Sequence, residues 1–301
     1  MSAVAELIET ESAVHRHEPL SRYTSWRVGG PADLFFRPKS YEALGTFLAS
    51  LPDVTPVSWI GLGSNLLIRD GGVRGAVICT SGLPKTFDAS ADGRVEASAA
   101  LPCATLAKRC ARLALGPAAF FAGIPGSLGG ALAMNAGAFG GETWDSIESV
   151  DVMDRKGVVR MRRRNEFTVG YRSVQGAVDE WFVGARFVFS PEQSAEAERI
   201  RVLLRERSDR QPLGQPSAGS VFRNPEGAYA GEFIEQAGLK GRRHGGAMVS
   251  EKHGNFIINT GSATASDIEA LIEEVRASVL EATGIELQCE VHILGEQELP
   301  A

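Results

Sequence analysis

The sequence predicts a mixed fold of the α/β or α+β class, made of short strands, glycine-rich turns and helices. Apolar residues recur at helical spacing in residues 104–115 and 266–284. They alternate or run together, as in strands, in residues 147–162, 181–190 and 286–294. With 301 residues, of which 44% are hydrophobic and 23% charged, the chain is long enough for two or three compact domains.

Two helices are predicted in the middle of the chain. The first covers residues 104–115 and is amphipathic. Its apolar side consists of Leu106, Cys110 and Leu113. The second is expected to begin at Ser190, with Pro191 at its first helical position, and to continue to Arg210. Because this second helix is heavily charged, we interpret it as a connector between two domains.

A strand, a turn and a second strand are predicted for residues 147–162. The second strand lies in a basic stretch, residues 155–164, in which six Lys and Arg residues are interleaved with valine and methionine. This alternation predicts a solvent-exposed strand pair. Residues 181–190 are apolar on both faces, which is typical of a central strand.

A helix and a strand are predicted at the C-terminal end. The helix is expected to begin at Ser266, with a capping box between Ser266 and Glu269, and to end at Gly284. Its core stripe consists of Ile268, Leu271, Ile272, Val275 and Val279. Residues 286–294 alternate strictly as a strand, with Glu290 on the side opposite the apolar residues.

Composition disfavours several classes of function. The net charge of −6 argues against a nucleic-acid binder, which needs a basic face. No apolar run approaches the roughly 18 residues of a membrane span, and the acidic N-terminal segment has no secretory apolar core. None of the four cysteines has the spacing of a zinc ligand, which indicates buried thiols in a reducing compartment. We therefore expect a cytoplasmic protein with no metal site, no nucleic-acid partner and no membrane contact.

Two glycine-rich stretches, residues 59–78 and 123–142, stand out, and the second holds seven glycines in twenty residues. Bare backbone lets a phosphate approach closely, and successive N–H groups in a turn bind anions. Neither stretch places a lysine as a P-loop does, and the first lacks the third glycine of a dinucleotide fingerprint. Both stretches therefore fit either a bound pyrophosphate that does not react or tight packing through small residues, and spacing alone does not decide.

Three polar residues in apolar surroundings are candidates for chemistry. Arg172 in GYRS is either a functional cation or half of a surface ion pair. Ser220, in the bend SAGSVFRNP, is either a proton donor or a turn residue. Glu290 is costly to bury without a partner, which makes it a site candidate unless one face of its strand is in water.

Several segments occur in the order found in one known family. They are TSWRVGGPADLFFRP, GLGSNLLIRDGGVRGAVI, AGIPGSLGGALAMNAGAFGGE, GYRS, AGSVFRNP, and the tail from HGNFIIN to CEVHILG. Over about residues 20 to 296 the chain resembles the UDP-N-acetylenolpyruvoylglucosamine reductase family. Any one segment alone is weak, whereas together they are highly specific. The chain resembles the shorter form of the family, which lacks an extra tyrosine-bearing loop.

The resemblance implies an α+β fold with a two-lobed FAD-binding domain of the vanillyl-alcohol-oxidase type and a smaller α/β substrate domain after it. On this basis we expect the FAD-binding domain at residues 15–190, with lobes at about 15–80 and 81–190. A connecting helix at 191–210 and a substrate-binding domain at 211–301 would follow.

The cofactor implied by the resemblance is non-covalent FAD, with its diphosphate cradled by the two glycine stretches. The residues implied to bind it are Gly61, Gly63, Ser64, Asn65, Leu66, Gly123, Pro125, Gly126, Ser127, Gly129, Gly130, Asn135 and Ala136. Ala99 and Ala100 stand where the family tends to have glycine, so that segment is expected to contribute less to the flavin pocket.

The reaction implied by the resemblance has two halves. NADPH reduces FAD, and the reduced flavin then passes a hydride to the enolpyruvyl ether of a UDP-sugar, giving UDP-N-acetylmuramate for peptidoglycan synthesis. Arg172, Ser220 and Glu290 match the family's catalytic arginine, proton donor and catalytic glutamate. The residues implied to contact the substrate are Tyr171, Arg223 and Asn224. Its partners would be small molecules only, and we expect a monomer.

Two other functions remain open from the sequence. One is a different oxidoreductase of the same flavin fold, such as a sugar or lactone oxidase, although no histidine or cysteine loop for tethering FAD is evident. The other is a flavin or nucleotide carrier without catalysis, which would have no need for Arg172, Ser220 and Glu290 to act together.

Overall fold

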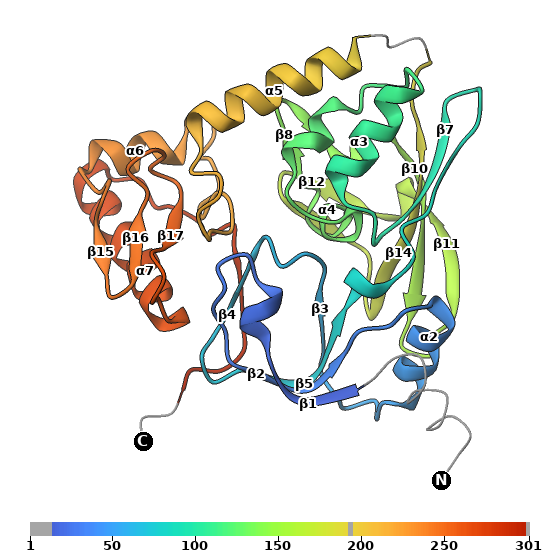
Figure 1. Ribbon diagram of the computed structural model, residues 1–301, viewed down its shortest axis with the longest axis horizontal. Helices are drawn as coiled ribbons and strands as arrows, with labels where there is room; N and C mark the ends of the chain where they lie inside the picture. Colours follow the sequence, from blue (N-terminus) through green and yellow to red (C-terminus); the bar gives the residue numbers. More distant parts are fainter. Residues whose placement is uncertain (1–13, 192–194, 299–301) are drawn as a thin grey trace. The chain divides into compact units, whose positions relative to one another are not determined.

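The computed structural model describes residues 14–191 and 195–298. The chain divides into two compact units, and Figure 1 labels most of their helices and strands. The first unit consists of Phe36–Gly61 and Ile78–Arg207, and the second of His15–Phe35, Leu62–Val77 and the chain from Ser208 onwards. Each unit is therefore assembled from segments that are distant in the sequence.

The first unit is built around a five-stranded antiparallel sheet with the strand order β11, β10, β14, β7, β6 (Figure 1). Its strands are β6 (Phe87–Ala89), β7 (Arg94–Ser98), β10 (Ile147–Asp154), β11 (Val159–Arg163) and β14 (Glu180–Val188). Strand β14 pairs with β10 on one side and β7 on the other, which confirms the predicted central strand. Strands β10 and β11 form the predicted pair, but only the basic β11 is an exposed edge. The predicted exposure of β10 is wrong, because β10 also pairs with β14 and is mostly buried.

The other strands of the first unit are short. They are β3 (Val57–Ile60), β8 (Gly137–Ala138), β9 (Gly141–Glu142), β12 (Thr168–Gly170) and β13 (Ser173–Gln175). Strands β8 and β9 form one antiparallel ladder, and β12 and β13 form another. The first ladder is part of the glycine-rich stretch 123–142, and the second brings Gly170 and Arg172 into contact with that stretch.

Helices complete the core of the first unit. They are α2 (Tyr41–Ser50), α3 (Cys103–Arg112), α4 (Leu128–Met134) and most of α5 (Glu196–Arg210), with 3-10 turns η2 (Thr80–Gly82), η3 (Ala119–Gly123), η4 (Thr143–Ser146) and η5 (Arg164–Glu166). Buried side chains from α3, η3, α4 and the sheet form one apolar cluster. Helix α3 confirms the predicted amphipathic helix, but it ends at Arg112, so Leu113 is 53% exposed and does not join the apolar side.

The predicted start of the connector helix is wrong. Ser190 pairs with Gly116 in an antiparallel bridge and Pro191 lies in a bend, so neither residue is helical. The bridge is held by two backbone hydrogen bonds of 2.7 and 3.1 Å, which outweigh the local helix-start signal. Residues 192–194, where the prediction continues, lie outside the described residues, and α5 is helical from Glu196 to Arg210.

Among the described residues, the second unit contains small sheets, the helices α6 and α7 and the 3-10 turn η1. Strands β1 (Val14–Pro19), β2 (Pro31–Phe36) and β5 (Val73–Cys79) are neighbours in that order, β4 (Leu66–Ile68) pairs with β18 (His292–Leu294), and β15 (Arg243–His244), β16 (Ala247–Val249) and β17 (Ile257–Asn259) form the third sheet. The helices are η1 (Leu20–Tyr23), α6 (Ala230–Gln236) and α7 (Ala265–Thr283). The apolar faces of α6 and α7 share one buried cluster with Trp26, Leu67 and Phe222.

Helix α7 is the best-defined prediction of the C-terminal region. All five residues of its predicted core stripe are at most 1% exposed, and Gly284 ends it with a left-handed φ of +74°. The predicted capping box is wrong, because the N-cap is Thr264, whose side chain accepts from Asp267 N at 3.0 Å. The Asp267 carboxylate in turn accepts a hydrogen bond from Thr264 N at 3.1 Å.

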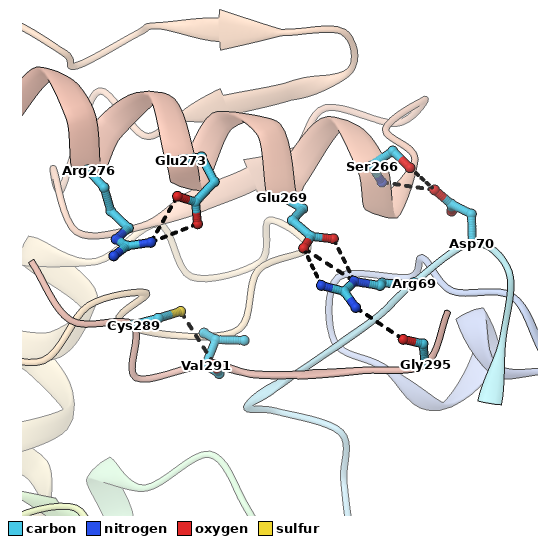
Figure 2. A network of polar contacts seen from close by, with 9 residues as sticks. All are labelled: Arg69, Asp70, Ser266, Glu269, Glu273, Arg276, Cys289, Val291 and Gly295. Atoms are coloured by element: carbon cyan, nitrogen blue, oxygen red, sulfur yellow. Dashed lines mark hydrogen bonds and ion pairs between the residues drawn. The ribbon is translucent and has the colours of Figure 1, made fainter. Parts of the chain in front are cut away.

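Ser266 and Glu269 have tertiary partners instead, as Figure 2 shows. Asp70 accepts hydrogen bonds from Ser266 N and Ser266 Oγ, both at 2.8 Å. Arg69 donates to both carboxylate oxygens of Glu269, with a shortest distance of 2.7 Å, and to Gly295 O at 3.3 Å. These bonds fasten the first turn of α7 to the residues that follow β4 and β18.

The predicted strand 286–294 is mostly wrong. Only His292–Leu294 forms a strand, and it is parallel to Leu66–Ile68. The ladder stops there because β4 is three residues long, and the preceding segment pairs with a different part of the chain at Cys289. The alternation of burial is retained in part, since Leu287 and Val291 are buried.

Two general expectations can be compared with the fold. The thiols of Cys79, Cys103 and Cys110 are free and buried as predicted, whereas Cys289 is half-buried. Burial raises the pKa of both Cys103 and Cys110 to about 12, so these thiols stay protonated near neutral pH. Within residues 14–191 and 195–298, no helix has the length and apolarity needed to cross a membrane.

We predict that Asp267→Ala lowers the free energy of unfolding by about 1 kcal/mol at pH 7, because it removes the carboxylate half of the capping box, which accepts from Thr264 N and Gly246 N. Burial raises the pKa of Asp267, but hydrogen bonds from Thr264 N, Gly246 N and the Thr264 hydroxyl outweigh it, so the pKa is lowered. A depressed carboxyl pKa contributes stability above the unfolded-state value of about 3.9, and this contribution disappears as the pH falls through the folded-state pKa.

Urea unfolding of wild type and Asp267→Ala, from pH 7 down into the acid range, tests the prediction. The difference in free energy of unfolding between the two proteins should be largest at pH 7 and should become smaller at acid pH. Glu273→Ala is the control, since Glu273 lies on the same helix in an exposed ion pair with Arg276. A difference independent of pH would contradict the role of the charged cap.

Candidate functional site

The second glycine stretch packs closely against its own unit around the start of α4. Leu128 N donates to Leu101 O at 2.8 Å, and Gly129 N donates to Ala99 O at 2.7 Å. A Cβ atom built on Gly129 would lie 3.1 Å from Ala99 Cβ, so only the bare backbone fits without displacement. Packing through small residues, one of the two interpretations of this stretch, therefore accounts for Gly129.

Beside this packed contact, the structure leaves room at the next residue. A Cβ on Gly130 would meet only Ser127 Oγ, at 3.8 Å, whereas a Cβ on Gly61 would lie 2.4 Å from the same hydroxyl. The end of β3 and the start of α4 therefore approach each other at Ser127, with the Gly130 backbone uncovered. A bare backbone next to a hydroxyl is a cradle that fits a phosphate group.

Asn135 connects the glycine stretch to the motif GYRS. It ends α4 in the left-handed conformation with a φ of +47° and is 1% exposed. Its Nδ2 donates to Glu142 Oε2 at 2.8 Å and to Gly170 O at 3.1 Å, and its Oδ1 accepts from Trp144 N at 3.1 Å. The side chain of Asn135, implied by the resemblance to bind FAD, thus organises the loop around it. Its neighbour Ala136 is buried.

Arg172 lies in the turn Tyr171–Arg172 between β12 and β13. Its Nη2 donates to Gly137 O at 3.0 Å, and its guanidinium lies 4.9 Å from the centre of the Tyr171 ring. The backbone of Arg172 has a φ of +53°, which costs a non-glycine residue about 1 kcal/mol. Its guanidinium is therefore held against the glycine stretch by a strained turn.

In the second unit, the first glycine stretch supports the C-terminal segment. Gly63 has a φ of +62°, and a Cβ there would lie 1.9 Å from Tyr23 O, so this position requires glycine. Asn65 Nδ2 donates to Glu290 O at 3.0 Å, and Asn65 O accepts from His292 N at 3.1 Å. Leu66 then begins β4, and Ser64 is half-buried. Asn65 thus connects the predicted flavin loop to the predicted catalytic glutamate.

The segments that contain Ser220 and Glu290 lie side by side in the second unit. Glu290 N donates to Val221 O at 2.7 Å, and Arg223 N donates to Gln288 O at 2.8 Å, around a bridge between Phe222 and Cys289. Both Ser220 and Glu290 are half-buried. Two of the three predicted catalytic residues are thereby held on paired backbone segments, although they are 70 positions apart in the sequence.

The residues after Ser220 are oriented by the same unit. Asn224 Oδ1 accepts from Ala230 N, the first residue of α6, at 3.2 Å. Arg223 Nε is buried and has no hydrogen-bond partner within the part of the chain that the structure describes. A buried donor without a partner is unusual in a folded protein. This Nε–H group is suited to donate a hydrogen bond to an anionic ligand.

Two residues that support the predicted site segments, one in each unit, were missed at the level of sequence. Asn255, in the motif HGNFIIN, accepts from Phe222 N at 2.9 Å and donates to Phe222 O at 2.8 Å through its side chain. Glu196 is 1% exposed and lies in the first turn of α5. An asparagine directly before an apolar strand is a weak signal for the first, and nothing in the sequence distinguishes Glu196 from its charged neighbours.

Glu196 holds the chain just ahead of the second glycine stretch. Its Oε2 accepts from Ala118 N at 2.8 Å and Ala119 N at 2.7 Å, at the start of η3. Its Oε1 accepts from Arg199 at 3.1 Å. The close approach requires glycine at 116, where a Cβ would lie 2.7 Å from Glu196 Cδ. A buried carboxylate therefore fixes the turn that leads into Gly123.

Comparison with known proteins defines the class. Residues 32–162 match the family described as FAD binding domain, and residues 211–294 match the family described as UDP-N-acetylenolpyruvoylglucosamine reductase, C-terminal domain. The chain is therefore a flavoprotein with an FAD-binding domain followed by a smaller C-terminal domain. The expected α+β fold class and FAD as cofactor are confirmed.

Full-length relatives define the family. Curated proteins named UDP-N-acetylenolpyruvoylglucosamine reductase from Alkalilimnicola ehrlichii and Methylococcus capsulatus are 53% and 52% identical to this chain. Each alignment covers 94% of this chain, and 95% and 93% of the relatives. The crystal structure of the Thermus caldophilus UDP-N-acetylenolpyruvylglucosamine reductase is 32% identical, with a TM-score of 0.79 over 94% of this chain and 99% of that one. The chain belongs to the UDP-N-acetylenolpyruvoylglucosamine reductase family, which confirms the resemblance.

We predict that Glu196→Ala lowers the free energy of unfolding by about 3 kcal/mol, since two buried N–H groups lose a charged acceptor. The flavin should also be retained less well through gel filtration, because the turn before Gly123 loosens. Denaturant unfolding and the ratio of flavin to protein absorbance measure the two effects. Glu198→Ala is the matched control, because Glu198 is on the same helix in an exposed pair with Arg201. Equal losses in both variants would contradict the prediction.

Proposed function

We propose that this protein is an NADPH-dependent flavoenzyme that reduces UDP-N-acetylglucosamine enolpyruvate to UDP-N-acetylmuramate, a step in the synthesis of peptidoglycan precursors. One observation in particular supports this within a family of reductases. The segments of Ser220 and Glu290 are paired in the second unit, beside Arg223 Nε, which is buried and has no hydrogen-bond partner among the described residues. A proton donor, a carboxylate and an anion-binding group are thus supplied by one small region.

We assign the domains as the sequence suggested. Residues 15–190 would bind FAD, with lobes at about 15–80 and 81–190, residues 191–210 would connect, and residues 211–301 would bind the substrate. The family matches at 32–162 and 211–294 support this division. We further propose that the protein is a monomer and is located in the cytoplasm. The buried free thiols suit such a reducing compartment.

The residues proposed to hold FAD fit the group in this structure. The uncovered Gly130 backbone and the Ser127 hydroxyl would receive a phosphate, next to Gly61. Gly123 ends η3, and Pro125 and Gly126 follow in the turn before α4. Glu196 holds the start of η3. FAD, when bound, supplies the hydride that it has received from NADPH. The protein's part is to bind the diphosphate with backbone and hydroxyl donors, without a lysine or arginine in the loop.

Arg172 is proposed to stabilise the negative charge that builds on the substrate when hydride is added next to its carboxylate. A guanidinium is always protonated and offers several donors in one plane, so it suits an enolate and its carboxylate. Its contact with Gly137 O fixes the orientation of the group in advance. Preorganised charge of this kind stabilises a transition state without reorganisation during the reaction.

Ser220 is proposed to donate the proton that completes the reduction, and Glu290 to orient the substrate carboxylate. Both residues are held by backbone pairing rather than by long flexible side chains. Arg223, Asn224 and Tyr171 are proposed to bind the sugar nucleotide. Arg223 Nε would donate to its anionic part, while the bond from Ala230 N fixes the Asn224 amide.

The proposal predicts a yellow protein that releases free FAD on heating or in acid. NADPH should bleach it, and UDP-N-acetylglucosamine enolpyruvate should restore the colour with catalytic turnover. Absorbance at the flavin band and consumption of NADPH measure the two steps. If the enolpyruvyl substrate leaves the reduced flavin unchanged, the proposal is wrong, whereas bleaching alone would favour a different flavin oxidoreductase.

For Ser220→Ala we predict that bleaching by NADPH persists at a rate within about twofold of wild type. Recovery of the flavin by the enolpyruvyl substrate should slow by a factor on the order of 100 or more, the scale of a lost general acid. Stopped-flow absorbance separates the two half-reactions. Equal slowing of both would argue against the role as proton donor.

A further inference from the structure

Asn255 occupies the place that a neighbouring strand would normally take beside Ser220. The segment Val221–Arg223 has Gln288–Glu290 on one edge, where Val221 O and Arg223 N are bonded. The groups of Phe222 point to the other edge, because successive peptide groups of an extended chain alternate in direction. There the Asn255 side chain accepts from Phe222 N at 2.9 Å and donates to Phe222 O at 2.8 Å.

The backbone of Asn255 adds a third bond to the same segment. Val221 N donates to Asn255 O at 3.0 Å, which fixes the peptide group that joins Ser220 to Val221. Asn255 is itself held in place, since its backbone N–H donates to His253 Nδ1 at 3.2 Å and Asn255 is only 2% exposed. From Val221 N to Arg223 N, every backbone donor and acceptor therefore has a partner, and Asn255 supplies three of the five.

From this arrangement we infer that Asn255 is a positioning residue for proton delivery by Ser220. The inference rests on the proposed function. Asn255 contacts neither flavin nor substrate in this scheme, and acts only through the backbone of Val221 and Phe222. Loss of its side chain would leave Phe222 N–H and C=O unpaired and let the Ser220 segment rotate. Misplacement of a reacting group by about 1 Å costs a factor on the order of 100 in rate.

The inference separates the two half-reactions. Bleaching by NADPH does not involve Ser220, so Asn255→Ala should change its rate by less than about twofold. Recovery of the flavin by the enolpyruvyl substrate should slow roughly 10- to 100-fold. Because proton delivery then limits the rate more strongly, the solvent deuterium isotope effect on this recovery should increase. A variant with only a loosened fold would show no such selective change.

A matched control is available in the same motif. Asn259 is also a buried asparagine whose side chain bridges backbone groups. It donates to Trp26 O at 2.9 Å and accepts from Gly261 N and Ala263 N at 2.8 and 3.0 Å. Asn259→Ala therefore removes at least as many side-chain hydrogen bonds as Asn255→Ala. The Asn259 side chain, however, bonds neither Val221 nor Phe222.

A conservative variant provides a rescue. In Asn255→Asp the carboxyl keeps the acceptor for Phe222 N, and its protonated form also donates to Phe222 O. Burial raises the pKa of a carboxyl group, so recovery of the flavin should be faster than in Asn255→Ala. The gain should increase as the pH is lowered. If Asn255→Ala does not fold, Asn255→Asp compared with Asn259→Asp provides the test, with selective slowing at high pH as the expected result.

The experiment is stopped-flow measurement of both half-reactions on the FAD-loaded wild type and variants, in H₂O and D₂O. Selective slowing of flavin recovery in Asn255→Ala, but not in Asn259→Ala, supports the inference. It is overturned if both half-reactions slow equally, if neither slows, or if Asn259→Ala shows the same selectivity. Should the wild type itself fail to recover with the enolpyruvyl substrate, the proposed function and this inference fall together; recovery in wild type with an unaffected Asn255→Ala overturns the inference alone.

Discussion

The second unit depends on one constraint: the buried backbone around Phe222 must find partners on both of its edges. Val221 and Phe222 are at most 1% exposed, so water cannot satisfy their peptide groups. An unpaired buried group costs roughly 1–3 kcal/mol, which is a large share of the 5–15 kcal/mol that stabilises a typical domain. The chain meets this requirement with Gln288–Glu290 on one side and Asn255 on the other. The positions of Ser220 and Glu290 follow from the same pairing.

The glycine-rich stretch of the first unit shows that packing and ligand binding need not exclude each other. Gly129 uses its N–H on Ala99 O and has no room for a side chain, whereas Gly130 beside it is open. Ala99, which stands where the family tends to have glycine, therefore still accepts a hydrogen bond from the Gly129 backbone through its carbonyl oxygen. A backbone held rigidly on one face and bare on the other is preorganised for an anion. The tight packing of Gly129 thus holds the exposed backbone of Gly130 in a fixed position.

Sequence patterns predicted what depends on local periodicity and failed where tertiary partners decide. The core stripe and end of α7 follow from spacing and from the glycine at 284. Its start did not, because Ser266 and Thr264 both suit a cap, and Asp70, distant in the sequence, binds Ser266. Alternation at 286–294 indicated a strand, yet the ladder is limited by the three residues of β4. Arg172, Ser220 and Glu290 were candidates as polar residues in apolar surroundings, and the family resemblance supplied their expected roles and the other site residues. Neither signal reveals supports such as Asn255.

The energetic costs in the structure favour an enzyme over a carrier that only binds flavin. Arg172 has a strained φ of +53°, and Arg223 Nε is buried without a hydrogen-bond partner among the described residues. A carrier needs neither feature, because its ligand is held by the glycine stretches. Strained and unsatisfied groups persist when the surrounding structure imposes them, and they concentrate at functional sites. Both of these residues are cations, which is the charge that an anionic ligand requires.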